Sequence, residues 1–284
     1  MHITPFFEHV TCTFSYVIHD QQTKDAVIID PVLNFDAASG KISHDSTNKL
    51  KDFIRNNKLI PQLVLDTHVH ADHMTGSFFV KKLFKIKSAI GEGFLSSQDY
   101  FRKIYETDVA SYELPYEHLL KNNEIINAGS IEIKALAVPG HTPSCTAYLI
   151  GNNVFSGDSL FQPNLGCGRA DFPGGSAYDL FNSIKHQLYT LPDDTILWVG
   201  HDYPPTGETP KASTTILESK KHNRLIKADT KMEEFILQRE NKDKTLNAPK
   251  LLLPSLQVNI TGGQLPHKDQ MGHRFLRIPL SIDE

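Results

Sequence analysis

Short apolar stretches separated by polar turns mark the first part of the chain as β-rich. The stretches 10–18 and 26–29 flank the polar residues 19–22, a pattern that predicts a β-hairpin. Downstream, composition predicts a loop rich in Ser, Gly and Asp at about 36–47. Periodicity then predicts a helix at 50–56 and a further strand at 62–65.

A helical pattern follows at 77–85. It places Phe79 with Leu83 and Val80 with Phe84, each pair four residues apart. Residues at this spacing share one face of a helix, so we expect all four side chains to pack into the core against a sheet.

The second half of the chain also alternates strands with helices. Strands are predicted at 131–136, 146–150, 154–155 and 195–199, and a helix at 176–190. After the last strand the pattern is mostly helical, and Thr230 followed three residues later by Glu233 predicts a capping box at the start of a helix that runs to about 240.

Composition narrows the class of protein. With 284 residues, 39% hydrophobic and 22% charged residues and a formal net charge of −4, the chain has the profile of an ordinary globular protein. Nucleic acid is therefore an unexpected partner, no stretch is apolar for long enough to cross a membrane, and the first residues lack the pattern of a secretory signal. The segment 211–250 has a mild basic bias, which is typical of a solvated helical surface and alternatively indicates an anionic ligand.

The three cysteines lie far apart. Cys12, Cys145 and Cys167 have no CxxC spacing, so neither a disulfide framework nor a thiolate zinc site is indicated. A reducing cytoplasm is the compartment that fits them best.

Four predicted strands each lead into a possible metal ligand. These ligands are His68, His141, Asp158 and His201. Strand ends that lie side by side in one sheet meet at one edge, so we expect the four side chains to converge there.

The first of these ligands belongs to the sequence Thr-His-Val-His-Ala-Asp-His, which contributes His68, His70, Asp72 and His73. Three imidazoles within six residues would repel one another if all were protonated, so they favour a bound cation. We expect Asp72 and His73 to lie at the start of a helix over 73–85, and Gly140, Gly157 and Gly200 to let the backbone approach the ion closely.

The motif followed by Gly-His, Gly-Asp and Gly-His resembles the metallo-β-lactamase superfamily over about residues 8–205. The resemblance implies an α/β fold, the αββα sandwich, with a short C-terminal helical extension and tail. We expect a catalytic domain at 1–205 and, at 206–284, the extension and tail packed on the same domain. Intact ligands disfavour a non-catalytic member of the fold, and the scarcity of basic residues near the motif disfavours a phosphodiesterase.

Finer features resemble the persulfide dioxygenases, and within them a bacterial branch linked to sulfide detoxification. They are the segments 29–32, 70–77, 167–172, 201–203 and 249–259. The alternative is a zinc-dependent glyoxalase II-type thioester hydrolase (hydroxyacylglutathione hydrolase), which shares the order of ligands but has a larger C-terminal helical domain.

These two families use the ligands differently. A di-zinc hydrolase would bind one ion with His68, His70 and His141 and the other with Asp72, His73 and His201, with Asp158 bridging. A persulfide dioxygenase would bind one Fe(II) with His68, His141 and Asp158, and would keep His70, Asp72, His73 and His201 around it as hydrogen-bonding residues or as a possible second site. Spacing alone does not distinguish iron from zinc.

The resemblance to persulfide dioxygenases also implies the substrates. Glutathione persulfide and O2 would give sulfite and glutathione, a separately encoded sulfurtransferase is a possible partner, and a homodimer is expected. Arg169 is the candidate for the substrate carboxylates and Tyr203 for a further hydroxyl donor, while the alternative for Arg169 is an ion pair with Asp171 or Asp202. Cys167 is expected to be a small buried thiol without a catalytic role.

Overall fold

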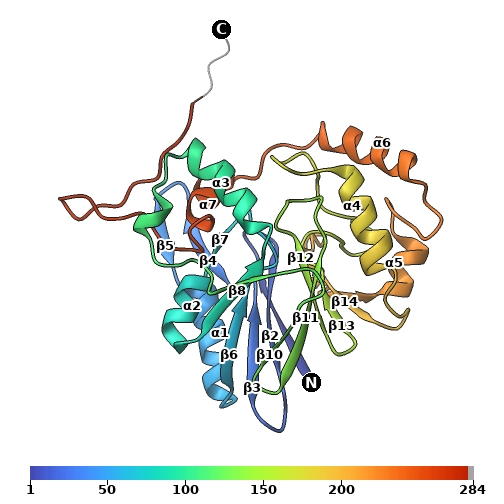
Figure 1. The fold of residues 1–284 in the computed structure, drawn as a ribbon, viewed down its shortest axis with the longest axis horizontal. Helices are drawn as coiled ribbons and strands as arrows, with labels where there is room; N and C mark the ends of the chain where they lie inside the picture. Colours follow the sequence, from blue (N-terminus) through green and yellow to red (C-terminus); the bar gives the residue numbers. More distant parts are fainter. Residues whose placement is uncertain (281–284) are drawn as a thin grey trace.

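Two six-stranded β-sheets lie at the centre of the computed structural model, which describes residues 1–280 (Figure 1). The first sheet has the order β1 (His2–Glu8), β2 (Thr13–His19), β3 (Asp25–Ile29), β6 (Ile60–Leu65), β8 (Lys87–Gly91) and β9 (His118–Leu120). The second has the order β10 (Ile125–Ala128), β11 (Ile131–Ala137), β12 (Thr146–Ile150), β13 (Asn153–Phe155), β14 (Ile196–Trp198) and β15 (Ser213–Thr215). A third, three-stranded sheet has the order β5 (Lys41–Ser43), β4 (Val32–Asp36) and β7 (Met74–Thr75).

Helices lie on the outer sides of the two large sheets and along the upper end of the molecule in Figure 1. They are α1 (Asp45–Asn56), α2 (Ser77–Phe84), α3 (Phe94–Ile104), α4 (Ala177–Ser183), α5 (Ile216–His222), α6 (Met232–Asp243) and α7 (Leu252–Asn259), with a 3-10 turn at Val109–Ser111 and a π-helical turn at Ile184–Leu188. The expected αββα sandwich is therefore confirmed.

The alternation of side chains along β2 explains why two layers form. Tyr16 and Ile18 point into the core between the two large sheets, whereas Val17 belongs to the cluster that α1 and α2 cover on the opposite face. Successive residues of a strand point to opposite faces, so a strand that is apolar throughout requires cover on both sides.

The predicted hairpin is confirmed, but the elements around it are more numerous than the pattern indicates. β2 and β3 pair antiparallel, and β1 precedes them as an additional edge strand paired to β2. The expected loop at 36–47 is largely structured, because β4 ends at Asp36, β5 follows and α1 begins at Asp45.

Two expectations about helices are wrong. The helix after the histidine motif begins at Ser77, as the pattern at 77–85 predicts, and not at 73, so Asp72 and His73 lie in a loop. Within this helix Phe79 and Leu83 are exposed, and only the Val80 face packs on the sheet. The capping box at Thr230 does not form, because its hydroxyl accepts a hydrogen bond from the amide of Lys227.

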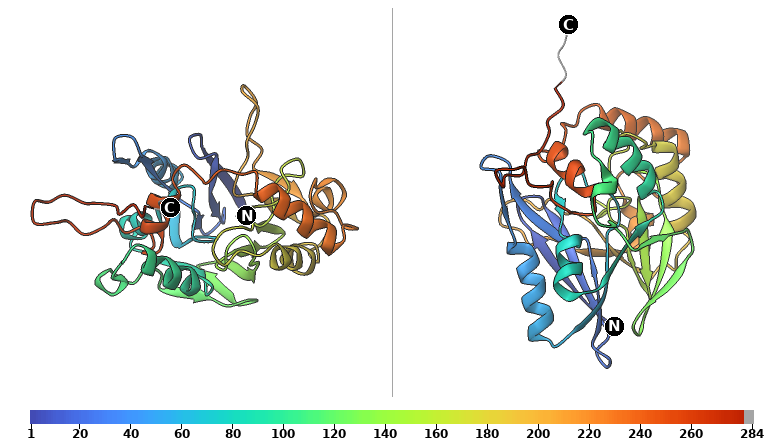
Figure 2. Two further views of the ribbon diagram at one scale, coloured as in Figure 1. Left: turned by 90° about the horizontal axis from the view of Figure 1, so that it is seen from above. Right: turned by 60° about the vertical axis from the view of Figure 1, so that its left-hand side comes forward.

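The C-terminal part of the chain contacts both halves of the sandwich. Helix α6 packs on α4, where Phe181 and Phe235 are in contact, and α7 packs on β7, where Val258 meets Leu33 and Met74. After α7 the chain forms a long loop that extends away from the body (Figure 2). Within residues 1–280 no helix combines the length and the hydropathy needed to span a membrane.

Candidate metal centre

The expected ligands meet in one place, but they come from two sheets and not from one. His68 lies in the loop after β6 of the first sheet, whereas His141, Asp158 and His201 follow β11, β13 and β14 of the second. The sandwich places the ends of both sheets at a common edge, which the prediction of a single sheet did not include.

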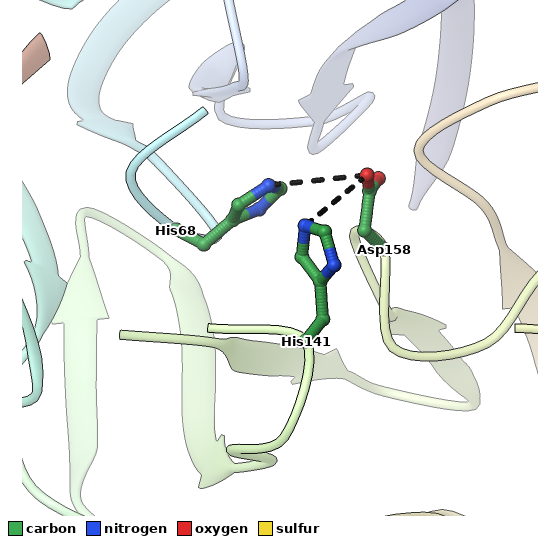
Figure 3. Close-up of side chains that lie close together, drawn as sticks. All are labelled: His68, His141 and Asp158. Atoms are coloured by element: carbon green, nitrogen blue, oxygen red, sulfur yellow. Dashed lines mark ion pairs between the residues drawn. The ribbon is translucent and has the colours of Figure 1, made fainter. Parts of the chain in front are cut away.

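One cluster consists of His68, His141 and Asp158, which Figure 3 shows pointing toward one another. The Oδ2 atom of Asp158 lies 4.0 Å from Nε2 of His68 and 3.6 Å from Nε2 of His141. All three residues are buried, and their ligand atoms lie within 4.8 Å of one another. Two imidazoles and one carboxylate at this separation can bind one metal ion.

A second group adjoins the first through the other oxygen of Asp158. Its Oδ1 atom lies 3.4 Å from Nε2 of His201, and the same nitrogen lies 3.4 Å from Oδ2 of Asp72. Nδ1 of His73 lies 3.3 Å from the same oxygen of Asp72, and His70 completes a cluster with these two residues. Asp158 therefore stands between two neighbouring sets of ligands.

Protein partners occupy one ring nitrogen of each histidine. The Nδ1–H groups of His141 and His201 donate to the carbonyl oxygens of Arg169, at 2.6 Å, and of Cys12, at 3.0 Å. Because a carbonyl only accepts, these contacts fix the tautomer and leave Nε2 free to bind a metal.

The other three histidines follow the same rule. Nε2 of His70 contacts the carboxylate of Asp30 at 3.1 Å. Nδ1 of His68 contacts the hydroxyl of Thr67, and Nδ1 of His73 contacts the carboxylate of Asp72. The nitrogens that remain are buried and have no hydrogen-bond partner within the described part of the chain. Orphaned buried acceptors are costly, so the donor set fits a metal site.

Electrostatics keep two of these ligands neutral. Burial, followed by repulsion from a neighbouring imidazole, holds the pKa of His68 and of His70 well below the usual range. Burial also acts on His73 and His201, but the nearby carboxylates, Asp72 for His73 and Asp158 for His201, outweigh it and raise their pKa.

Hydrogen bonds from three distant elements hold the loop that carries the motif. The carboxylate of Asp30 accepts from the amide and the hydroxyl of Thr67, and the hydroxyl of Ser144 accepts from the amide of Val69. The third contact comes from Asn259 in α7 and was missed by the sequence analysis, because nothing in the local pattern distinguishes an asparagine at the end of an apolar helix.

Two glycines next to the ligands are required for different reasons. Gly157 has a φ of +51°, and a Cβ there would lie 2.5 Å from the hydroxyl of Thr67. Gly200 has no such backbone requirement, but a Cβ there would lie 2.5 Å from Oδ1 of Asp158. The expected close approach to a ligand is therefore seen at Gly200, whereas Gly157 faces Thr67, and Gly140, with a φ of +135°, faces the backbone of Leu180.

A cavity of about 1090 Å³ opens onto the ligands. Its wall includes Asp72, His73, His141 and Asp158 on one side and many apolar side chains elsewhere. The wall also includes four lysines, two from each end of the chain: Lys41, Lys49, Lys242 and Lys250. Among residues 1–280 none of the four forms an ion pair with a carboxylate, although the wall also includes the carboxylates of Glu8, Asp36 and Asp45.

The expected substrate residues have different surroundings. Arg169 lines the cavity, but its guanidinium forms a bidentate ion pair with Asp171, at 2.6 and 2.7 Å, and donates to the carbonyl of Asn247. This is the alternative that the sequence left open for Arg169. Tyr203 is half exposed at the cavity wall and stacks on the ring of His201. Cys167 is buried and burial raises its pKa to about 11, as expected of an unreactive thiol.

Comparison with known proteins identifies the family. Residues 13–201 match the model of the metallo-beta-lactamase superfamily. A protein named "Glyoxylase B2" from Dictyostelium discoideum is 40% identical over 283 residues, which cover 98% of this chain and 97% of the relative. Relatives named "Beta-lactamase hydrolase-like protein" from Xylella fastidiosa are similar to this chain over 65% of their length, so the chain spans less than two thirds of those proteins.

Two more distant relatives bear another name. The human protein "Persulfide dioxygenase ETHE1, mitochondrial" is 31% identical over 199 residues, which cover 69% of this chain and 66% of the relative. The crystal structure of ETHE1 from Myxococcus xanthus superimposes with a TM-score of 0.75 at 30% identity and covers 93% of this chain and 100% of that one. The fold, the ligand motif and these matches show that the chain belongs to the metallo-beta-lactamase superfamily.

Proposed function

We propose that this protein is a metal-dependent hydrolase of the glyoxalase II type, which cleaves a thioester of an anionic thiol such as glutathione. The observation that carries the proposal is the position of Asp158, whose two oxygens face the two sets of ligands at 3.4 to 4.0 Å. A carboxylate between two such sets suits a bridging position between two ions. The name of the 40% identical relative, "Glyoxylase B2", supports the same choice.

The residues divide between two ions as follows. His68, His70 and His141 would hold the first with the nitrogens that their protein partners leave free. His70 also clusters with Asp72 and His73, and its ring centroid lies 4.1 Å from that of His68 and 4.2 Å from that of His73, so it lies beside both sets. Asp72, His73 and His201 would hold the second, and Asp158 would contact both. When bound, a pair of such ions lowers the pKa of water to near neutrality and polarises a carbonyl group.

The chain itself contributes neutrality, orientation and a binding surface. Neutral His68 and His70 keep their lone pairs available, and the carboxylate of Asp30 prevents the ring of His70 from turning away. Tyr203 lies at the cavity wall, where its hydroxyl is in a position to donate to a substrate group.

Two lysines of the cavity wall offer partners for an acidic substrate. Lys242 and Lys250 come from the segment whose basic bias was noted in the sequence, and both line the cavity. Of the two interpretations of that bias, a solvated surface or an anionic ligand, we therefore adopt the anionic ligand. Glutathione carries two carboxylates, and apolar wall residues such as Phe35 and Leu246 offer contact area for the rest of a conjugate.

The second candidate is the persulfide dioxygenase, favoured by the similarity to ETHE1 from Myxococcus xanthus over its whole length. The cluster of His68, His141 and Asp158 is the two-histidine, one-carboxylate set that suits a single ferrous ion with open positions. The substrates would then be glutathione persulfide and O2, with a sulfurtransferase as the possible source of persulfide.

One experiment separates the two candidates. Protein reconstituted anaerobically with zinc or with Fe(II) is assayed for cleavage of S-D-lactoylglutathione and, in an oxygen electrode, for O2 uptake with glutathione persulfide. The hydrolase should cleave the thioester with zinc and without oxygen, on the order of 1–10³ per second. If only the iron-loaded protein is active, and only as persulfide-dependent oxygen uptake with sulfite release, the dioxygenase replaces the hydrolase, because zinc has no redox chemistry.

A further inference from the structure

The side chain of Asn259 makes three hydrogen bonds to the loop that carries the metal ligands. Its Oδ1 accepts from the amide of Thr75 at 2.8 Å, and its Nδ2 donates to the carbonyl oxygens of His70 and His73, each at 2.8 Å. The residue is 1% exposed and lies at the end of α7, 186 positions after His73.

The loop is held from different directions in its two halves. Asp30 and Ser144 bind the half that begins at Thr67, and both belong to the central sandwich. The backbone of the half with Asp72 and His73 is bracketed by the three bonds from Asn259, after which Met74 and Thr75 pair with β4. The hydroxyl of Thr13 contacts the side chains of Asp72 and His73, each at 3.4 Å, but not this backbone. Asn259 therefore acts on the part of the loop that provides the second set of ligands.

The chemistry of the contact explains why the residue is an asparagine. Two carbonyl oxygens need two donors and one amide needs an acceptor, and a primary amide supplies all three from a single side chain. An ionised aspartate would offer no donor, and an alanine would leave two carbonyls and one amide without partners in a buried place.

Packing of α7 determines the position of the Asn259 side chain. Val258, the neighbour of Asn259 in α7, packs in one apolar cluster with Leu33 and Met74. Movement of α7 would therefore carry Asn259 away from the loop, because the helix and the loop share this small apolar cluster.

We propose that Asn259 is a positioning residue for Asp72 and His73, and that it links metal binding to the docking of the C-terminal helix. Asn259 lies outside residues 13–201, the part of the chain that matches the family model, whereas the loop that it holds lies inside. It concerns how the loop is held, so it applies to either of the two candidate reactions.

The test compares Asn259→Ala with a matched control elsewhere in the chain. Asn223 is also fully buried and also makes three hydrogen bonds to backbone, donating to Gly166 and accepting from Leu225 and Ile226 at 3.0 Å. Asn223→Ala removes the same kinds of bond without touching the ligand loop. Asn259→Ser, which keeps one donor and an acceptor, serves if the alanine variant does not fold.

Two readouts are used, and neither is activity. Zinc stoichiometry and affinity are measured by competition with a chromogenic chelator, and hydrogen exchange of the metal-free proteins is measured over residues 66–77. For Asn259→Ala we expect one zinc to bind about 10–100-fold more weakly, the range seen when an outer partner of a metal ligand is lost. Exchange should rise at 70–77 and not at 67–69, whereas Asn223→Ala should change neither readout.

Failure of the inference is distinct from failure of the proposed function. Unchanged zinc binding together with unchanged exchange at 70–77 in the Asn259 variants would overturn the positioning role. So would an equal loss of zinc in Asn223→Ala, which would mean that general destabilisation is the cause. If the wild-type protein binds only one metal ion, the exchange experiment on the metal-free protein still decides the role of Asn259.

Discussion

Oδ1 of Asp158 lies 3.4 Å from Nε2 of His201, while the other oxygen of the same carboxylate faces the first set of ligands. Because one side chain serves both sets, its charge should matter to both ions. We expect Asp158→Asn, which keeps the shape and loses the charge, to weaken zinc binding at both positions by at least about 100-fold. Loss of a residue that only hydrogen-bonds to a metal ligand already weakens binding by up to about 100-fold, and Asp158 would contact the ions directly.

Metal content after dialysis against buffered zinc measures this effect. Asp193→Asn, at an exposed ion pair with Lys220, is the control and should keep the wild-type stoichiometry. Loss of only one of two ions in Asp158→Asn would contradict the bridging position and would assign Asp158 to a single site.

Gly200 provides a steric test of the same carboxylate. A methyl group there would lie 2.5 Å from Oδ1 of Asp158, so the carboxylate or the backbone must shift. We expect Gly200→Ala to lower zinc affinity by about tenfold or more, since ligand geometry must be held within a few tenths of an ångström. Gly151→Ala, at a turn with open space around it, has the greater backbone strain at φ +57° yet should leave metal binding unchanged. Equal zinc affinities in the two variants would refute the steric argument.

The pairing of Arg169 with Asp171 predicts a structural role for both residues. The bidentate pair and the bond to Asn247 hold the start of the segment that leads to α7, so removal of either partner should loosen it. We expect Arg169→Ala and Asp171→Ala each to lower the melting temperature, and the double variant to be less destabilised than the sum of the two.

Kinetics on the same variants test the role first expected for Arg169. If the arginine binds substrate carboxylate, Arg169→Ala alone should raise KM by about tenfold or more, equivalent to a charge-assisted contact of roughly 1.5–3 kcal/mol. A similar and small change of KM in both single variants is the outcome that the observed ion pair predicts.

Lys242 is a better candidate for contact with an anionic substrate. It is half buried in the cavity wall, and burial lowers its pKa, followed by repulsion from Arg239 and Arg224. An added anion would relieve this repulsion, so Lys242→Met should raise KM for a glutathione thioester by about tenfold, equivalent to ~1.4 kcal/mol.

A neighbouring lysine supplies the control. Lys244 is exposed and does not line the cavity, so Lys244→Met should leave KM unchanged. The effect at Lys242 should also shrink as salt concentration increases, because screening weakens exposed charge interactions. A KM that is insensitive to Lys242→Met at low salt would place the anionic end of the substrate elsewhere.

The sequence by itself determined the chemistry of the site and most of the fold. His68, His70, Asp72 and His73 lie within six residues, and His141, Asp158 and His201 each follow a short apolar strand and a glycine, so their identity as ligands did not depend on knowing the structure. The apolar runs at 10–18 and 26–29 and the polar turn between them likewise predicted the hairpin, because these signals are local in the sequence.

What depended on contacts between distant residues was decided only by the tertiary structure. Phe79 is apolar but lies outside the region that the sheet covers. The sequence left the pairing of Arg169 with Asp171 as an alternative, and the further contact with the carbonyl of Asn247 comes from 78 positions away. Asn259 reaches the ligand loop across 186 positions, and only the packing of α7 on β7 brings it there. Local periodicity reports which face of an element is apolar, whereas the partner of that face is fixed by the arrangement of the whole chain.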